Sequence, residues 1–160
     1  DTVRNGQGTM KYSNGETFKG MWKMDNRHGK GVFILKNGDK VEGQWINDVL
    51  ETMVKIKYSN GDRYEGEINP NTMQKHGKGV LIFKDGSRYE GRWMNDKYDE
   101  NGKYTSKGDG RVCEEIWKGG SLQETFMTCA DGTQYQAKWE RVKKLLDAVI
   151  KLLVLIQIML

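Results

Sequence analysis

The chain has 160 residues, with 26 Lys and Arg against 22 Asp and Glu, a formal net charge of +4, and 20 Gly but one Pro. This even balance does not fit nucleic-acid binding, which needs a clustered basic face, so no nucleic-acid partner is expected. Two cysteines, Cys113 and Cys129, are too few for a disulfide framework and indicate buried thiols in a reducing, cytoplasmic compartment. Because the chain begins at Asp1 without Met, we expect it to be an excised fragment.

A pattern of turn and strand residues recurs along most of the chain. Its clearest copy runs from Asn37-Gly38 to Trp45: counted from the turn glycine, it has an apolar residue at three, Gly at five and Trp at seven. The turn glycines stand at positions 15, 38, 61, 86, 110 and 132, at spacings of 23, 23, 25, 24 and 22 residues. Six copies at a nearly fixed spacing indicate a repeat architecture.

Each copy predicts a β-hairpin, and the first copy indicates the length of its loop. A two-residue loop would put Phe18 on the same face as Lys11. A three-residue loop over 13–15 puts Phe18 with Met10 and Tyr12 instead. Because side chains alternate along a strand, apolar residues must gather on one face to be buried. The sequence therefore predicts three-residue loops with the glycine in a left-handed conformation.

These loops assign the large apolar residues to one face of the predicted sheet. The opposite face carries Lys19, Glu42, Glu65 and Glu90 and is expected to be solvated. Glycines in the middle of the apolar face are expected to leave room for a ring of a neighbouring repeat. We interpret the aromatic residues mainly as packing between repeats, with direct partner contact as the weaker alternative. The candidate partner-binding residues of this face are Phe18, Trp22, Trp45, Tyr64, Tyr89 and Trp93.

The pattern is interrupted at two places. A second glycine pair follows the Trp of a typical copy, as in His28-Gly29-Lys30-Gly31, but the third copy has Thr52-Met53-Val54 instead. From Asp99 onward the glycine and apolar positions are replaced, so the fifth hairpin is predicted to be the least regular.

Residues 140–160 end the repeats and predict a helix. Glu140, Lys144, Asp147 and Lys151 form one polar stripe at helical spacing, and apolar residues fill the opposite side. We therefore expect an array over 1–139 and a C-terminal helix over 140–160. The expected contact surface of this helix is Leu145, Val149, Leu152, Leu153, Ile156 and Leu160.

An isolated helix of this length is marginal in water, so its apolar side is expected to pack on the sheet. The favoured dock is the aromatic face near Trp93 and Trp117, because no linker separates Trp139 from the helix. The alternative dock is the reverse face, which carries Val32, Ile34, Val80 and Ile82. Residues 152–160 are apolar on nearly every side and are expected to meet a second surface: a twin chain, another protein or a bilayer. A transmembrane helix is the weaker choice, since spanning needs about 20 apolar residues.

The run from Phe18 through His28-Gly29-Lys30-Gly31 to Asn37-Gly38 resembles a MORN repeat. The family pattern is an aromatic-x-Gly, a spacer, His-Gly-x-Gly and an Asp/Asn-Gly turn. The resemblance covers about residues 6–98 well and 99–139 poorly. It implies an all-β fold, an elongated single-layer antiparallel meander of stacked hairpins, here followed by a C-terminal α-helix. It also implies uses in protein scaffolding, attachment to membranes or cytoskeleton, and modules beside enzymes.

No set of residues in the sequence predicts catalysis, a metal site or a cofactor. His28 and His76 occupy the same slot two repeats apart, roughly 19 Å at the spacing of β-strands, which is too far to share an ion. The two cysteines stand in inward slots, and no phosphate-loop motif occurs. No enzymatic activity of the chain is therefore expected.

The leading functional expectation is a non-catalytic scaffold or adaptor. Its aromatic face or C-terminal helix would dock a protein partner, a helix or a peptide, in a larger cytoskeletal or membrane-associated assembly. One alternative is a module that binds anionic lipid, although Glu42 and Glu65 dilute the field of Lys11 and Lys19. Another is the regulatory portion of a larger enzyme. A homodimer through the C-terminal helix is a further expectation.

Overall fold

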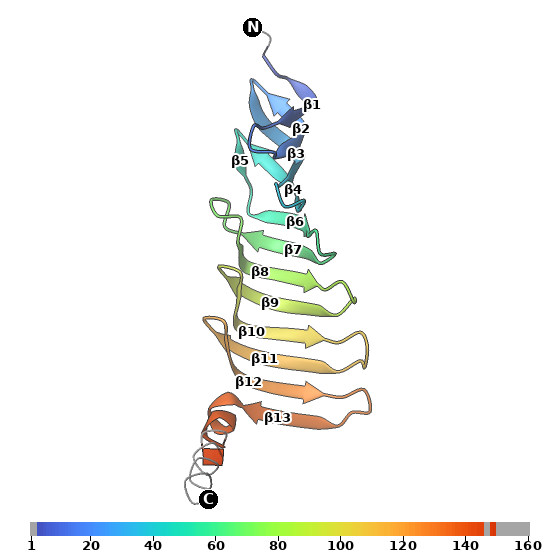
Figure 1. Cartoon of the computed structure of the whole chain (residues 1–160), viewed down its shortest axis with the longest axis vertical. Coiled ribbons are helices and arrows are strands. Elements are labelled where there is room, and N and C mark those ends of the chain that lie inside the picture. The colour runs from blue at the N-terminus through green and yellow to red at the C-terminus, as the bar shows by residue number, and fades with distance from the viewer. Residues whose placement is uncertain (1–2, 146–147, 150–160) are drawn as a thin grey trace, which may run out of the picture.

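The computed structural model, which describes residues 3–145 and 148–149, contains a single open antiparallel sheet (Figure 1). Consecutive strands are neighbours in the order β1-β2-β3-β4-β6-β7-β8-β9-β10-β11-β12-β13, and the short β5 pairs with β4 alone. The predicted all-β meander, followed by a short helix after β13, is confirmed. The strands are β1 Gly6–Lys11, β2 Thr17–Lys23, β3 Asn26–Ile34, β4 Lys40–Ile46, β5 Val49–Leu50, β6 Met53–Lys57, β7 Arg63–Ile68, β8 Lys75–Ile82, β9 Arg88–Met94, β10 Lys97–Thr105, β11 Val112–Lys118, β12 Ser121–Thr128 and β13 Gln134–Lys138.

The loop between β1 and β2 has the predicted three residues. The Tyr12 amide donates to the Glu16 carbonyl at 2.9 Å, and the Gly15 amide donates to the Tyr12 carbonyl at 3.1 Å. Gly15 has a φ of 91°, the left-handed region that glycine enters without strain. The Asn14 side chain accepts a hydrogen bond from the Glu16 amide at 3.0 Å, which explains why Asn or Asp precedes the glycine.

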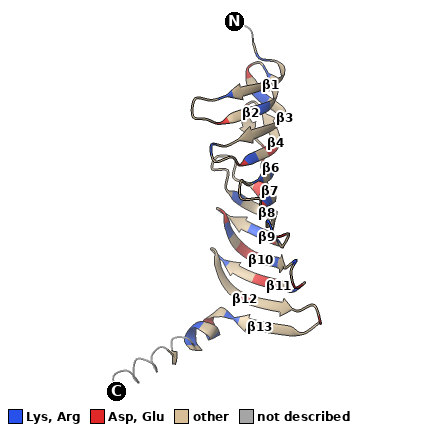
Figure 2. Ribbon diagram, turned by 45° about the vertical axis from the view of Figure 1, so that its right-hand side comes forward, with Lys and Arg blue, Asp and Glu red and all other residues tan. Residues whose placement is uncertain are grey.

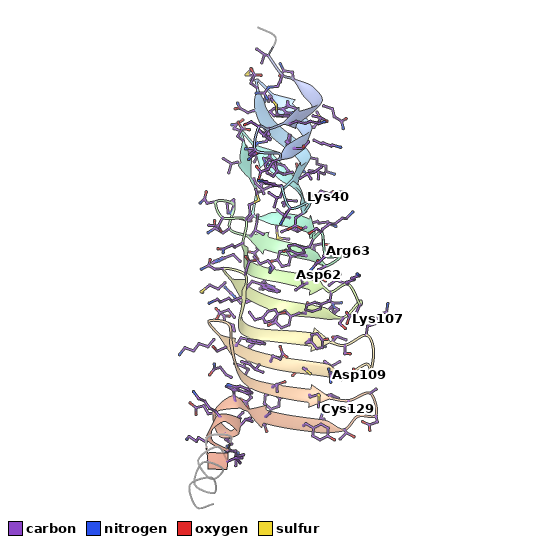
Figure 3. All side chains as sticks on the ribbon, in the orientation of Figure 1. Lys40, Asp62, Arg63, Lys107, Asp109 and Cys129 are labelled. Carbon is purple, nitrogen blue, oxygen red and sulfur yellow. The ribbon has the colours of Figure 1, made fainter. Side chains whose placement is uncertain are left out.

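Hydrogen bonds also join successive hairpins along the edge of the sheet where the three-residue loops lie. The Ser59 amide donates to Oδ1 of Asp39, and the Lys84 amide donates to Oδ1 of Asp62, both at 2.8 Å. The Lys107 amide donates to the Ser87 hydroxyl at 3.1 Å. Figure 3 labels Asp62 and Lys107 on this edge. These bonds fix the stacking of one three-residue loop on the next.

The other edge, at the opposite ends of the strands, is held by ion pairs between residues 21 positions apart. Arg4 donates to Oδ1 of Asp25 through its amide and through Nε, both at 2.9 Å. Arg27 makes the same two bonds to Asp48, at 2.8 and 2.9 Å. Asp25 and Asp48 have φ values of 67° and 69°, so these contacts hold the carboxylate residues of tight turns. The backbone and side-chain bonds from Arg4 lower the pKa of Asp25.

The apolar face predicted from the alternation is the core of the sheet. Phe18, Tyr64 and Tyr89 are no more than 1 % exposed. Each ring lies over a glycine two residues further along its own strand; a Cβ at Gly20, for example, would stand 2.7 Å from Cζ of Phe18. The space at these glycines is therefore filled by a ring of the same strand, and not by a ring of a neighbouring repeat as the sequence had suggested.

The second hairpin and the start of the third fill the same space with aliphatic residues. Val41 stands in the slot of Phe18 and is too small to cover Gly43. A Cβ at Gly43 would instead stand 2.7 Å from Cδ1 of Leu50 and 3.3 Å from Cγ1 of Val54. Leu50 belongs to β5, which pairs with the end of β4 at Trp45 and Ile46. The loss of the glycine pair thus interrupts the strand and supplies a side chain for the core.

The C-terminal helix does not dock as the sequence predicted. Helical residues begin at Trp139, directly after β13, and the described part of the helix lies beyond the end of the sheet (Figure 2). Val142, Leu145 and Val149 are 39, 68 and 52 % exposed, so neither face of the sheet covers them. The absence of a linker is the reason: without a turn, the chain continues past the edge strand and does not reverse over a face.

Candidate functional site

The aromatic residues proposed for partner binding form two clusters on one face of the sheet. Phe18 packs edge-on against Trp22 and Trp45, with ring centroids 5.2 and 5.0 Å apart. Trp93 packs edge-on against Tyr64 and Tyr89, at 5.7 and 5.5 Å. All six are buried, with at most 6 % of the residue exposed, which is the packing role favoured by the sequence. They present little surface to a partner in this conformation. The six are Phe18, Trp22, Trp45, Tyr64, Tyr89 and Trp93.

Cationic side chains cover several of these rings. The Arg4 guanidinium lies 4.2 Å from the centroid of the Trp22 ring, and the Lys75 ammonium lies 5.1 Å from that of Trp93. Arg4 is also paired with Asp25 at 2.9 Å, and Lys75 with Asp96 at 2.8 Å. A cation held between a carboxylate and a ring is a favourable arrangement when it is partly desolvated. The chain therefore covers part of its own aromatic face.

This cover ends in the fifth hairpin. Cys113 takes the slot of the large apolar residue, and Glu115 takes the slot of the glycine. Trp117 is only half-buried, and its indole nitrogen donates to Oε2 of Glu115 at 3.0 Å. Tyr135 in the last strand is 57 % exposed, and Trp139 is 55 % exposed. The face that is closed over most of the array is thus open at its C-terminal end.

The helix extends this open surface. Leu145 and Val149, the two described members of the predicted helix contact surface, are exposed. Arg141, Lys143 and Lys144, also exposed, add positive charge beside them. Leu152, Leu153, Ile156 and Leu160 lie outside the described residues.

The outer face of the sheet carries a long shallow groove that the sequence did not reveal. Three hollows of about 440, 430 and 580 Å³ follow one another from β3 to β12. The first two share Met53 and Glu65, and the last two share Glu90 and Asn101. Their charged residues have both signs; Lys55 and Glu65, for instance, pair at 3.1 Å. Such a surface is well solvated and offers no single-sign field to a ligand.

Among the described residues, no group of three or more His, Cys, Asp and Glu side chains is placed to hold a metal ion. Cys113 and Cys129 are free and half-buried, and burial raises the pKa of the Cys113 thiol, with the charge of Glu115 adding to the effect. In the described part of the chain, no helix is long and apolar enough to cross a membrane.

Comparison with known proteins identifies the repeat. The family model described as MORN repeat matches residues 1–17, 18–40, 74–88 and 89–111. The interval 41–73 contains the third hairpin, where Thr52-Met53-Val54 replace the second glycine pair. The family model thus leaves out a stretch that lies within the resemblance seen in the sequence, although the hairpin there keeps the same fold.

Among curated proteins, no sequence matches the chain significantly. One similar solved structure is the SAS-4 (dCPAP) TCP domain in complex with a proline-rich motif of Ana2 (dSTIL) of Drosophila melanogaster. It is 11 % identical, and the alignment covers 82 % of this chain and 89 % of that chain with a TM-score of 0.38. A likeness at this level bears on neither function nor partner. The four repeat matches, together with the sequential hairpins that contain them, make this chain a MORN-repeat protein.

Proposed function

We propose that the chain is a non-catalytic protein-interaction module that binds its partner at the C-terminal end of the array. MORN repeats suggest a repeat-based interaction module in general terms. The observation that carries the location is the change in exposure along one face: large apolar residues are buried or half-buried up to Trp93, whereas Tyr135, Trp139 and Leu145 are exposed. Exposed apolar clusters on a folded protein commonly mark interaction sites.

The partner is an apolar protein segment with acidic residues at its flanks. Apolar residues of such a segment would cover Trp139, Leu145 and Val149. Its carboxylates would meet Arg141 and Lys144, because opposite charges around an apolar centre guide and orient association. The outer groove is the less favourable surface, since its lysines and glutamates largely neutralise one another.

Site-specific photo-crosslinking of the full chain in cells tests this location. A benzophenone amino acid replaces Leu145 in one variant and Tyr135 in a second. Met24, which is 70 % exposed on a turn near the other end of the array, gives the control position. We expect the same discrete protein to be captured from positions 145 and 135 and not from 24.

The captured protein is then purified and mixed with the purified full chain. Joint replacement Trp139→Gln and Leu145→Gln should weaken its binding about tenfold or more, because truncating central apolar anchors costs at least 1.4 kcal/mol. Met24→Gln should leave the affinity unchanged. The proposal is overturned if the only adducts are two copies of this chain. It is equally overturned if the double variant loses binding to vesicles of anionic phospholipid but keeps its affinity for the protein.

A further inference from the structure

A carboxylate stands on the aromatic face at a position that is glycine in the preceding copies. Gly66 and Gly91 occupy this slot in the third and fourth hairpins, and Glu115 occupies it in the fifth. Glu115 is half-buried, and burial raises the pKa of its carboxyl group against the opposing effect of the Trp117 hydrogen bond. A half-buried carboxylate beside aromatic rings is costly unless a cation accompanies it.

The upstream copies show which cation suits such a place. Arg4 covers Trp22 and pairs with Asp25, and Lys75 covers Trp93 and pairs with Asp96. In each case the chain itself supplies the cation, the carboxylate and the ring.

At Trp117 the ring and the carboxylate are present, but the cation is missing. Tyr98 occupies the position of Arg4 and Lys75: its backbone carbonyl accepts a hydrogen bond from the Gly120 amide, as theirs do from the Asp25 and Asp96 amides. Within residues 3–145 and 148–149, no ion pair includes Glu115 and no cation lies over Trp117.

Two further groups around the carboxylate favour a donor-rich cation. Tyr98 is half-buried, and its ring centroid lies 4.9 Å from that of Trp117, which extends the aromatic surface. The Tyr89 side chain is buried, its hydroxyl lies over Gly102, and Gly102 pairs with Glu115 across the strands. This buried hydroxyl has no hydrogen-bond partner among the described residues, so it is an unsatisfied polar group next to the carboxylate.

We infer that Glu115, Trp117 and Tyr98 form a receptor for the guanidinium group of an arginine supplied by a partner protein. A guanidinium is planar, so it stacks on an indole while its N–H groups donate to a carboxylate. A lysine ammonium lacks both features, which makes arginine the better fit. This inference goes beyond the proposed function, because it concerns residues of β10 and β11 and the recognition of one side chain, and it holds whether or not the helix binds a protein.

The probe is N-acetyl-arginine amide, titrated into the ¹⁵N-labelled full chain. The indole N–H resonances are followed by NMR, and the Trp117→Phe variant assigns the resonance of Trp117. We expect the Trp117 resonance to shift in a saturable way while those of the buried tryptophans stay in place. N-acetyl-citrulline amide, which has the same shape without the charge, should cause no saturable shift.

Two variants separate binding from folding. Glu115→Gln keeps the size of the side chain but removes the charge, and should weaken arginine binding about tenfold or more, as expected for a lost charged hydrogen bond. Glu114→Gln changes the neighbouring carboxylate on the opposite face and should bind as the wild type does. Unmoved resonances of the buried tryptophans confirm that each variant is folded. Equal binding of citrulline, equal affinity of the two variants, or no shift of Trp117 up to the solubility limit of the probe would each overturn the inference.

Discussion

Single glycines decide where the aromatic rings of this sheet can lie. The Tyr64 side chain passes over Gly66 on its own strand and over Gly79 on the next strand. It then donates to the Glu67 carbonyl at 2.7 Å, which gives the buried oxygen a partner. Any side chain at these glycines would compete with the ring for the same volume, because the sheet has only one layer to absorb a displacement.

Gly66→Ala should therefore destabilise the array. The new Cβ would stand 2.7 Å from the Tyr64 hydroxyl and 2.6 Å from the Lys78 carbonyl, and forced overpacking costs about 1–3 kcal/mol. Gly108→Ala is the matched control, since its Cβ would meet only the Ser106 hydroxyl at 4.0 Å. Urea denaturation of both variants measures the difference; equal midpoints would contradict the packing assigned to Tyr64.

Asp48 should make stability depend on pH in the acid range. Burial opposes the effect, but hydrogen bonds from the Arg27 backbone and side chain hold the pKa of Asp48 below 3.8. A lowered folded-state pKa gives stability that is present above 3.8 and lost as the pH falls through the folded value. Asp48→Asn should thus lower the melting temperature at neutral pH, and the difference should shrink below pH 3.8. Glu42→Gln on the outer face is the control; a pH-independent difference would count against the ion pair.

Glu115 should make stability depend on pH in the opposite direction. Its pKa is raised by burial, so the stability associated with its protonated form is present below 4.5 and is lost as the pH rises through the folded-state value. Glu115→Gln should therefore raise the melting temperature at neutral pH and change it little in acid. A variant that is more stable but binds arginine less well is the pattern expected of a binding residue. A lower melting temperature at neutral pH would show that the ionised carboxylate has a partner within the fold.

At the scale of elements, the regular hairpins could be predicted and their exceptions could not. Asn-Gly and Asp-Gly pairs determine the loops locally, through the φ of the glycine and the side chain before it, so the strand order followed from the sequence. The strand β5 depends on a long-range requirement, namely that something must cover Gly43 when Val41 is too small. The prediction that the helix docks on the sheet was wrong for a related reason. Apolar periodicity shows which side of a helix should be buried, but not which surface buries it.

Leu50→Ala tests the role of β5. Leu50 is 5 % exposed and packs over Gly43, so its truncation should leave a cavity and cost about 2–5 kcal/mol. Its neighbour Val49 is 63 % exposed, and Val49→Ala should change the free energy of unfolding by less than about 0.5 kcal/mol. Thermal and urea unfolding of both variants give the comparison. Similar values for the two would mean that β5 contributes no core side chain.

On the scale of the whole molecule, the array is closed by its own side chains at one end and open at the other. The packing of the aromatic residues could be predicted from the sequence, but the cations over Trp22 and Trp93 could not, because Arg4 and Lys75 stand on the other arm of the same hairpin and meet the rings only once the strands pair. The copies that depart most from the repeat pattern, from Cys113 to Trp139, are those that leave aromatic and charged groups accessible. Decay of a repeat pattern is thus associated here with the surface that we propose for binding.

The most direct test of this account is hydrogen exchange of the full chain, alone and with the purified protein captured by crosslinking. Burial of the C-terminal end predicts slower amide exchange in residues 121–145, which contain β12, β13 and the start of the helix. Exchange in residues 17–46 should be unchanged, because that part of the aromatic face is already covered. Slower exchange confined to residues 53–94, in the middle of the outer groove, or no change in 121–145, would contradict the proposal.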